Sequence, residues 1–278
     1  MPDAFAYCAE LVRTADRDRY LAALFAPAER RRALHALYAF NSEVARVREA
    51  AREPLPGEIR LQWWSEVLRG DRGAEASANP VAAALLATIA NHALAPMRLV
   101  DLIEARRFDL YEEPMASVAD LKDHARKTAS LLFSLGAQIL CGLDLPAVAE
   151  PAGIAFAIAG LLRAFPLHAA RRQIYLPIDL LARHQVDRRD IYAARSSSGL
   201  KAAFAELREV ADRHLDSARA HMRVLPSDAL PAFLVLALVR PSLDRLSRCD
   251  PFAPAELAPW RRQWLMWRAA HNPARIAG

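Results

Sequence analysis

A cluster of basic side chains lies in the stretch LLRAFPLHAARRQIYLP, residues 161–177. Arg163, His168, Arg171 and Arg172 belong to it, and it contains no carboxylate. Guanidinium groups bind phosphate through paired, charge-assisted hydrogen bonds, so the cluster predicts an anion site that works without a metal ion. The alternative is a solvated basic face at a helix end, where cations complement the helix dipole.

A second candidate is Asn41, on a helix predicted from Pro27 to Glu53. Apolar residues recur along this segment at a spacing of three to four, and Asn41 falls on the same stripe as Leu37 and Val44. We therefore expect Asn41 to point inward, where a buried amide needs hydrogen-bond partners. It is either a satisfied polar group of the core or a ligand-binding residue.

The composition is that of a globular protein, with 54% hydrophobic and 25% charged residues in 278. Nine glycines argue against a Gly-rich nucleotide-binding α/β fold. The net charge is +5, and nearly all of the basic residues are arginines spread over the chain. Only local clusters of arginine are therefore informative about function. No aromatic and basic groove indicates nucleic-acid binding. Three distant cysteines argue against a zinc site.

The sequence also indicates a location. The first residues, MPDAFAYCAELV, lack the basic start and apolar core of a secretory signal. Apolar runs such as LPAFLVLALV are too short to cross a bilayer. We expect a cytoplasmic protein that contacts membranes only peripherally.

Nearly every segment is predicted to be helical, and none alternates as a strand does. Helix boundaries are indicated by Gly70 as a C-cap, by Asn79 and Pro80 at a helix start, and by Ser117 with Asp120 as a capping box. Residues 73–80 are predicted to be a loop. We expect one all-α domain over residues 1–278, with helices around a central space. Further helices are predicted at residues 56–70, 79–94, 96–110, 117–140, 150–162, 199–224 and 226–246.

Three segments match a known family in order and spacing: LFAPAERRRALHALYAFNSEVARVRE, LIEARRFDLYEEPMASVADLKDHARKTASLLFSLGAQILCG and LLRAFPLHAARRQIYLPIDLLARHQV. They resemble the squalene/phytoene synthases, and together they span nearly the whole chain. The resemblance implies an isoprenoid-synthase helical bundle around a central prenyl-chain cavity. Active members join two prenyl diphosphates head to head.

The resemblance also shows what is missing. Family members hold Mg²⁺ on pairs of aspartates one helical turn apart, which neutralise the departing diphosphate. Here the first pair falls on Ala45 and Glu49, and the second on Ala164 and His168. Alanine has no donor atom and histidine is a poor Mg²⁺ ligand, so the Mg²⁺-dependent reaction is expected to be lost.

An alternative keeps the activity with other carboxylates. Glu49 and Glu53 are four residues apart, as are Asp109 and Glu113, so either pair can share one side of a helix. Glu49 and Asp109 are therefore the candidate Mg²⁺ ligands if the chain is an active prenyltransferase. Otherwise no cofactor is expected.

The segment AFNSEVARVREA and the pattern H-x-x-R-R resemble one branch of the family, to which a mitochondrial assembly factor of respiratory complex I belongs. This resemblance implies a catalytically degenerate protein with an assembly role. Its implied protein partners are a membrane respiratory complex or the subunits of that complex. Its implied small-molecule ligand is a prenyl diphosphate or a lipid. Arg163, His168, Tyr38 and Tyr175 match cavity-facing positions of the family. The two tyrosines are interpreted either as core aromatics or as ligand-binding residues.

Residues 257–278 form a tryptophan- and arginine-rich C-terminal tail, predicted to be helical. Trp260, Trp264 and Trp267 fall on one helical face. One interpretation is a helix that contacts an anionic membrane or a partner protein. The other is a terminal helix that buries its tryptophans in its own domain.

Overall fold

The computed structural model describes residues 3–50, 53–111, 114–273 and 276, without the side chains of residues 49 and 50. Helices dominate this part of the chain, and no strand occurs in it. The chain divides into two compact units. Unit 1 comprises residues 1–111, 131–146 and 225–235, and unit 2 comprises residues 112–130, 147–224 and 236–278. The single domain over residues 1–278 stays a prediction.

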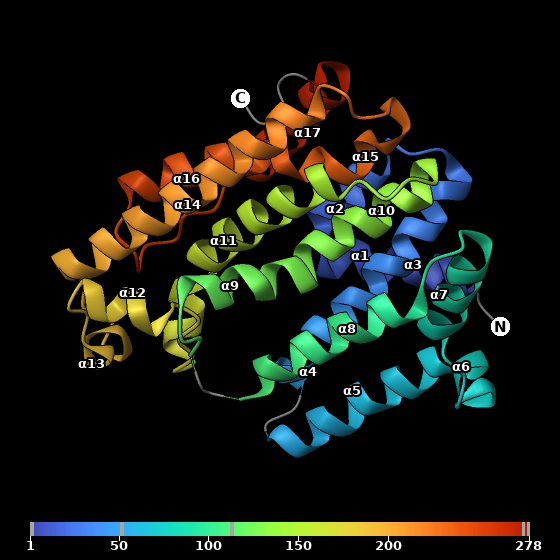
Figure 1. Cartoon of the computed structure of the whole chain (residues 1–278), viewed down its shortest axis with the longest axis horizontal. Helices are drawn as coiled ribbons and strands as arrows, with labels where there is room; N and C mark the ends of the chain where they lie inside the picture. Colours follow the sequence, from blue (N-terminus) through green and yellow to red (C-terminus); the bar gives the residue numbers. More distant parts are fainter. Residues whose placement is uncertain (1–2, 51–52, 112–113, 274–275, 277–278) are drawn as a thin grey trace. The chain divides into compact units, whose positions relative to one another are not determined.

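Unit 1 is built around α3, which packs against α1, α7 and α10, while α5 packs against α8 (Figure 1). The rings of Phe40 in α3 and Trp64 in α5 meet edge-on with centroids 5.0 Å apart, and both side chains are fully buried. The elements of unit 1 are α1 (Ala4–Ala15), α2 (Arg17–Ala23), α3 (Ala28–Ala45), α4 (Val47–Ala50), α5 (Pro54–Arg69), α6 (Gly73–Ala78), α7 (Pro80–Asn91), α8 (Pro96–Arg107), η1 (Phe108–Leu110), α10 (Leu131–Cys141), η3 (Ser227–Ala229) and α15 (Leu230–Phe233).

Two helix boundaries of unit 1 confirm the sequence signals. The side-chain oxygen of Asn79 accepts hydrogen bonds from the backbone N–H groups of Val81 and Ala82, at 2.9 and 3.0 Å, and Pro80 takes the first position of α7. Gly70 ends α5 in the left-handed conformation, with φ of 93°. Both ends depend on residues next to the helix, which is why the local sequence predicts them.

Two predicted helix extents in unit 1 are wrong. The sequence predicts one helix from Pro27 to Glu53, but α3 ends at Ala45, and Arg46 with φ of −97° and ψ of 6° separates it from α4. Arginine is a good helix former, so its helix propensity does not explain this break. The segment 73–80, predicted to be a loop, contains the short helix α6, which its alanines favour.

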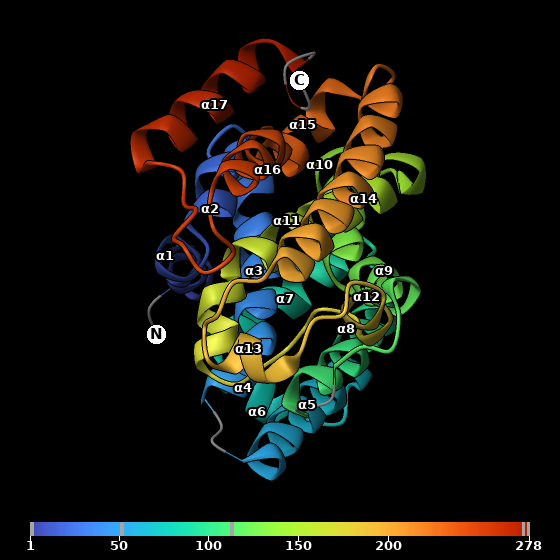
Figure 2. The ribbon, with the colours of Figure 1, turned by 90° about the vertical axis from the view of Figure 1, so that its left-hand side faces the viewer.

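In unit 2, α12 and α16 both pack against α14 (Figure 2). The predicted capping box is confirmed, since the hydroxyl oxygen of Ser117 accepts from the N–H of Asp120 at 3.2 Å and the Asp120 carboxylate accepts from the N–H of Ser117 at 2.9 Å. The elements are α9 (Val118–Ala125), a π-helical turn η2 (Arg126–Ser130), α11 (Pro146–Ala170), α12 (Ile178–Arg183), α13 (Arg188–Tyr192), α14 (Ser198–Met222), α16 (Val239–Arg248) and α17 (Pro259–His271); η4 (Leu234–Leu238) links the two units in sequence.

The helix α11 is longer than the predicted 150–162. It has 25 residues and continues through Pro151 and Pro166. By length and composition it could cross a membrane, and 61% of its apolar window is buried in the protein. The expectation that no segment reaches this length is therefore wrong. Its two prolines hid its extent, because each removes a backbone donor and disfavours helix.

The predicted C-terminal helix is present as α17, but its tryptophans are not in the core. Trp260, Trp264 and Trp267 are 69%, 48% and 54% exposed. The interpretation in which they pack into their own domain is wrong. Leu265, Met266 and Ala269 are buried on the opposite face of the helix instead.

Candidate functional site

The predicted anion site lies at the C-terminal end of α11, in unit 2. The N–H of Arg172 donates to the carbonyl of Ala169 at 3.0 Å, and the N–H of Gln173 donates to the carbonyl of His168 at 2.9 Å. These two bonds form a Schellman motif, in which Arg172 takes the left-handed position with φ of 58°. Glycine is favoured there, so an arginine costs about 1 kcal/mol or more. The motif ends the helix and turns the chain back.

The turn brings Tyr175 against His168. Their ring centroids are 4.7 Å apart at an interplanar angle of 65°, an edge-to-face arrangement. Arg163 and His168 are half-buried, whereas Arg171 and Arg172 are exposed. The half-buried pair is therefore better shielded from solvent than the exposed pair, as a phosphate site requires.

Two small residues and a histidine line one side of α11. Gly160, Ala164 and His168 follow one another at four-residue intervals, so they share a helical face, and each is half-buried. A methyl group added at Gly160 would meet no described atom within 4 Å. This face is open at its N-terminal end and carries no carboxylate where the metal-binding aspartates are expected from the resemblance.

The candidates in unit 1 gather on α3. Tyr38 and Asn41 are buried, at 3% and 7% exposure. Burial raises the pKa of Tyr38 to about 12, although the nearby Arg19 works against this. The side-chain oxygen of Asn41 has no hydrogen-bond partner among the described residues. A buried, unpaired amide oxygen is costly, which makes Asn41 more than an inert part of the core.

Arg19 was not among the site residues predicted from the sequence. Its guanidinium lies 5.6 Å from the centroid of the Tyr38 ring and 2.7 Å from the carboxylate of Asp16. Burial disfavours its charge, but Asp16, Tyr38 and Asp18 together more than offset this and leave the pKa of Arg19 raised. The alternating charges DRDR at residues 16–19, between apolar helices, were the available signal.

The residues that the structure describes do not form a magnesium site. Among the residues that the structure describes, no group of three or more His, Cys, Asp and Glu could hold a metal ion. Asp109 in η1 binds Arg106 at 2.9 Å. The side chain of Glu49 and the whole of Glu113 lie outside the described residues. Mg²⁺ demands several oxygen ligands in octahedral geometry, and the described side chains alone do not supply such a set.

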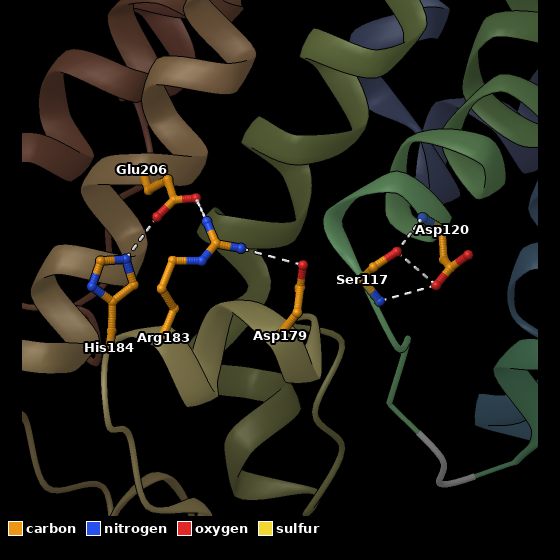
Figure 3. A network of polar contacts seen from close by, with 6 residues as sticks. All are labelled: Ser117, Asp120, Asp179, Arg183, His184 and Glu206. Atoms are coloured by element: carbon orange, nitrogen blue, oxygen red, sulfur yellow. Dashed lines mark hydrogen bonds and ion pairs between the residues drawn. The ribbon is translucent and has the colours of Figure 1, made fainter.

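A polar network in unit 2 was also missed. Glu206 of α14 binds Nε2 of His184 at 2.7 Å and also binds Arg183. Arg183 in turn contacts Asp179 at 3.2 Å (Figure 3). Only the Asp179 and Arg183 spacing was visible in the sequence, because Glu206 is far along the chain. The network joins the end of α12 to α14 through ion pairs and hydrogen bonds, so we interpret it as a clamp that holds α12 on α14.

The arrangement of helices and the site sequence agree with a family match. The squalene/phytoene synthase family profile matches residues 12–268, and the chain belongs to this family. Over 252 residues it is 32% identical to NADH dehydrogenase (ubiquinone) complex I, assembly factor 6 of Mus musculus, covering 90% of this chain and 76% of that protein. The corresponding protein of Homo sapiens is 31% identical over 88% of this chain and 74% of its own length.

Solved structures give the same fold. A dehydrosqualene synthase in complex with ligand has a TM-score of 0.82 at 18% identity, covering 96% of this chain and 95% of that one. A squalene synthase from Alicyclobacillus acidocaldarius has a TM-score of 0.68 at 21% identity, covering 96% and 93%. The predicted family and the all-α isoprenoid-synthase fold are confirmed.

Proposed function

We propose that this chain acts in the assembly of respiratory complex I and does not condense prenyl diphosphates. The observation that carries the proposal is the identity of 31–32% to proteins named complex I assembly factor 6, over about nine-tenths of the chain. Likeness over this length, rather than over one motif, supports a shared role. Its partners would then be subunits of a membrane respiratory complex.

The chemistry of the site supports loss of the family reaction. Ala45 and Ala164 stand at positions where the resemblance implies metal-binding aspartates. His168 takes a third such position and meets the ring of Tyr175 edge to face. Without Mg²⁺ to neutralise it, a departing diphosphate is a poor leaving group.

Arg163 and His168 are both half-buried. We propose that they hold the anionic head of a prenyl diphosphate or lipid directly, without turnover. Their partial burial supports this, because a charge-assisted bond gains strength as water is removed. We further propose that the protein works in the cytoplasm, in peripheral contact with the membrane that holds complex I.

The runner-up is an active prenyltransferase, which the structural likeness to dehydrosqualene synthase favours. Purified protein incubated with Mg²⁺ and farnesyl or geranylgeranyl diphosphate separates the two functions, with a squalene synthase as positive control. We expect no C30 or C40 product. Formation of either product at a rate comparable to the control would reject our proposal in favour of the runner-up.

A further inference from the structure

The exposed face of α17 is formed by large aromatic side chains. Trp260, Trp264 and Trp267 are the most conspicuous, with His271 continuing the same face one turn later. Each tryptophan leaves about half or more of its surface in solvent, at 69%, 48% and 54%. Exposed tryptophans gathered on one helix mark a contact surface.

The opposite face of this helix is buried in the protein. Leu265, Met266 and Ala269 are 6%, 1% and 1% exposed. This aliphatic face therefore supplies buried apolar surface that stabilises the helix, whereas the tryptophans stay about half exposed or more. Exposed tryptophans lower the solubility of a protein, so the presence of three on the exposed face calls for another explanation.

The charges on α17 are all of one sign. From Pro259 to His271 the helix carries three arginines and no Asp or Glu. The guanidinium of Arg268 lies 4.6 Å from the ring centroid of Trp264, and Arg261 is exposed beside Trp260. Basic groups thus flank the indoles at the edge of the aromatic face, as the headgroup region of an anionic bilayer requires.

We propose that the face of Trp260, Trp264 and Trp267 binds an anionic lipid surface, with α17 lying in the plane of the headgroups. Indoles favour this interface because their rings are apolar and their N–H groups can still bond to water or phosphate. Arg261 and Arg268 then meet lipid phosphates. Lipid binding rests on the proposed function only for the presence of a membrane, since it is a property of α17 itself.

The test uses the full chain with vesicles of phosphatidylcholine, alone or mixed with phosphatidylglycerol, in a sedimentation assay. We expect binding to the mixed vesicles only, and loss of that binding in the triple variant Trp260→Ser, Trp264→Ser, Trp267→Ser. Arg261→Gln and Arg268→Gln should each weaken binding about fivefold, and added salt should do the same.

A matched control is Tyr192→Ser, which removes another exposed aromatic of unit 2, 44% exposed. It should bind as the original protein does, and circular dichroism should show all variants folded. Equal binding by the triple variant would overturn the proposal. The proposal would also be overturned if the original protein does not bind anionic vesicles while the triple variant lowers complex I assembly in cells. The tryptophan face would then bind a protein partner. Absence of any complex I role with intact vesicle binding would reject only the proposed function.

Discussion

The ring of His168, at the end of α11, meets the ring of Tyr175 edge-on with centroids 4.7 Å apart. The two residues belong to the motif that binds metal in active relatives according to the resemblance, yet here they are joined by an aromatic contact. The contact ties the chain after the Schellman turn to the helix before it.

This contact should be measurable as a coupling energy. His168→Ala and Tyr175→Ala, alone and combined, form a double-mutant cycle in urea unfolding. We expect the two changes to be coupled by about 1 kcal/mol, since edge-to-face rings stabilise each other beyond their burial. Strictly additive effects would show that the rings do not support one another.

Arg163 should bind a diphosphate group without metal. Titration calorimetry with inorganic pyrophosphate is expected to show binding that EDTA does not abolish, because no metal ligands contribute. Arg163→Gln should weaken it about tenfold or more, the usual cost of a lost charge-assisted hydrogen bond. Arg188→Gln, an exposed arginine of the same unit, is the control and should change little. If both variants bind alike, the cluster is a solvated basic face.

Two glycines of α11 should respond oppositely to alanine. A methyl group at Gly153 would overlap the backbone of Ser130, so Gly153→Ala is expected to lower the free energy of unfolding by about 3 kcal/mol. At Gly160 the same group meets open space, and Gly160→Ala should raise it by about 0.5–1 kcal/mol through helix propensity. Urea unfolding measures both, and a loss of stability in Gly160→Ala would mean that its face is filled.

His35 should make stability depend on pH. Burial, with Arg31 nearby, lowers its pKa from 6.5 to about 4. Between pH 4 and pH 6.5 the imidazole binds a proton in the unfolded chain but not in the folded chain. The free energy of unfolding is therefore highest above about pH 6.5 and falls as the pH drops towards 4. The difference corresponds to about 3 kcal/mol. His35→Gln should flatten this part of the curve in urea unfolding, and an unchanged slope would assign it to other groups.

Helix ends that depend on contacts between neighbouring residues can be predicted from the local sequence. Asn79, Gly70 and the Ser117 capping box fix helix ends through neighbouring residues, so they were readable. The break at Arg46 has no local cause. Pro166 hid the length of α11, because in a buried helix the apolar packing outweighs its propensity cost.

The candidate site shows the same division. The missing carboxylates and the basic cluster are visible as residue types. The contact of His168 with Tyr175 depends on the turn at Arg172, and the clamp of His184 depends on Glu206, 22 residues away. On α17 both faces are apolar, and composition does not decide which one is buried. The packing of the aliphatic face decides it.

The assembly role is tested most directly in membranes from a strain of the source organism that lacks this gene. The measurement is NADH:quinone oxidoreductase activity, with succinate oxidation as the internal control. We predict that the NADH-dependent activity falls, that succinate oxidation is unchanged, and that the intact gene restores the NADH-dependent activity. Normal NADH-dependent activity in the deletion strain, together with loss of a C30 or C40 isoprenoid, would contradict it.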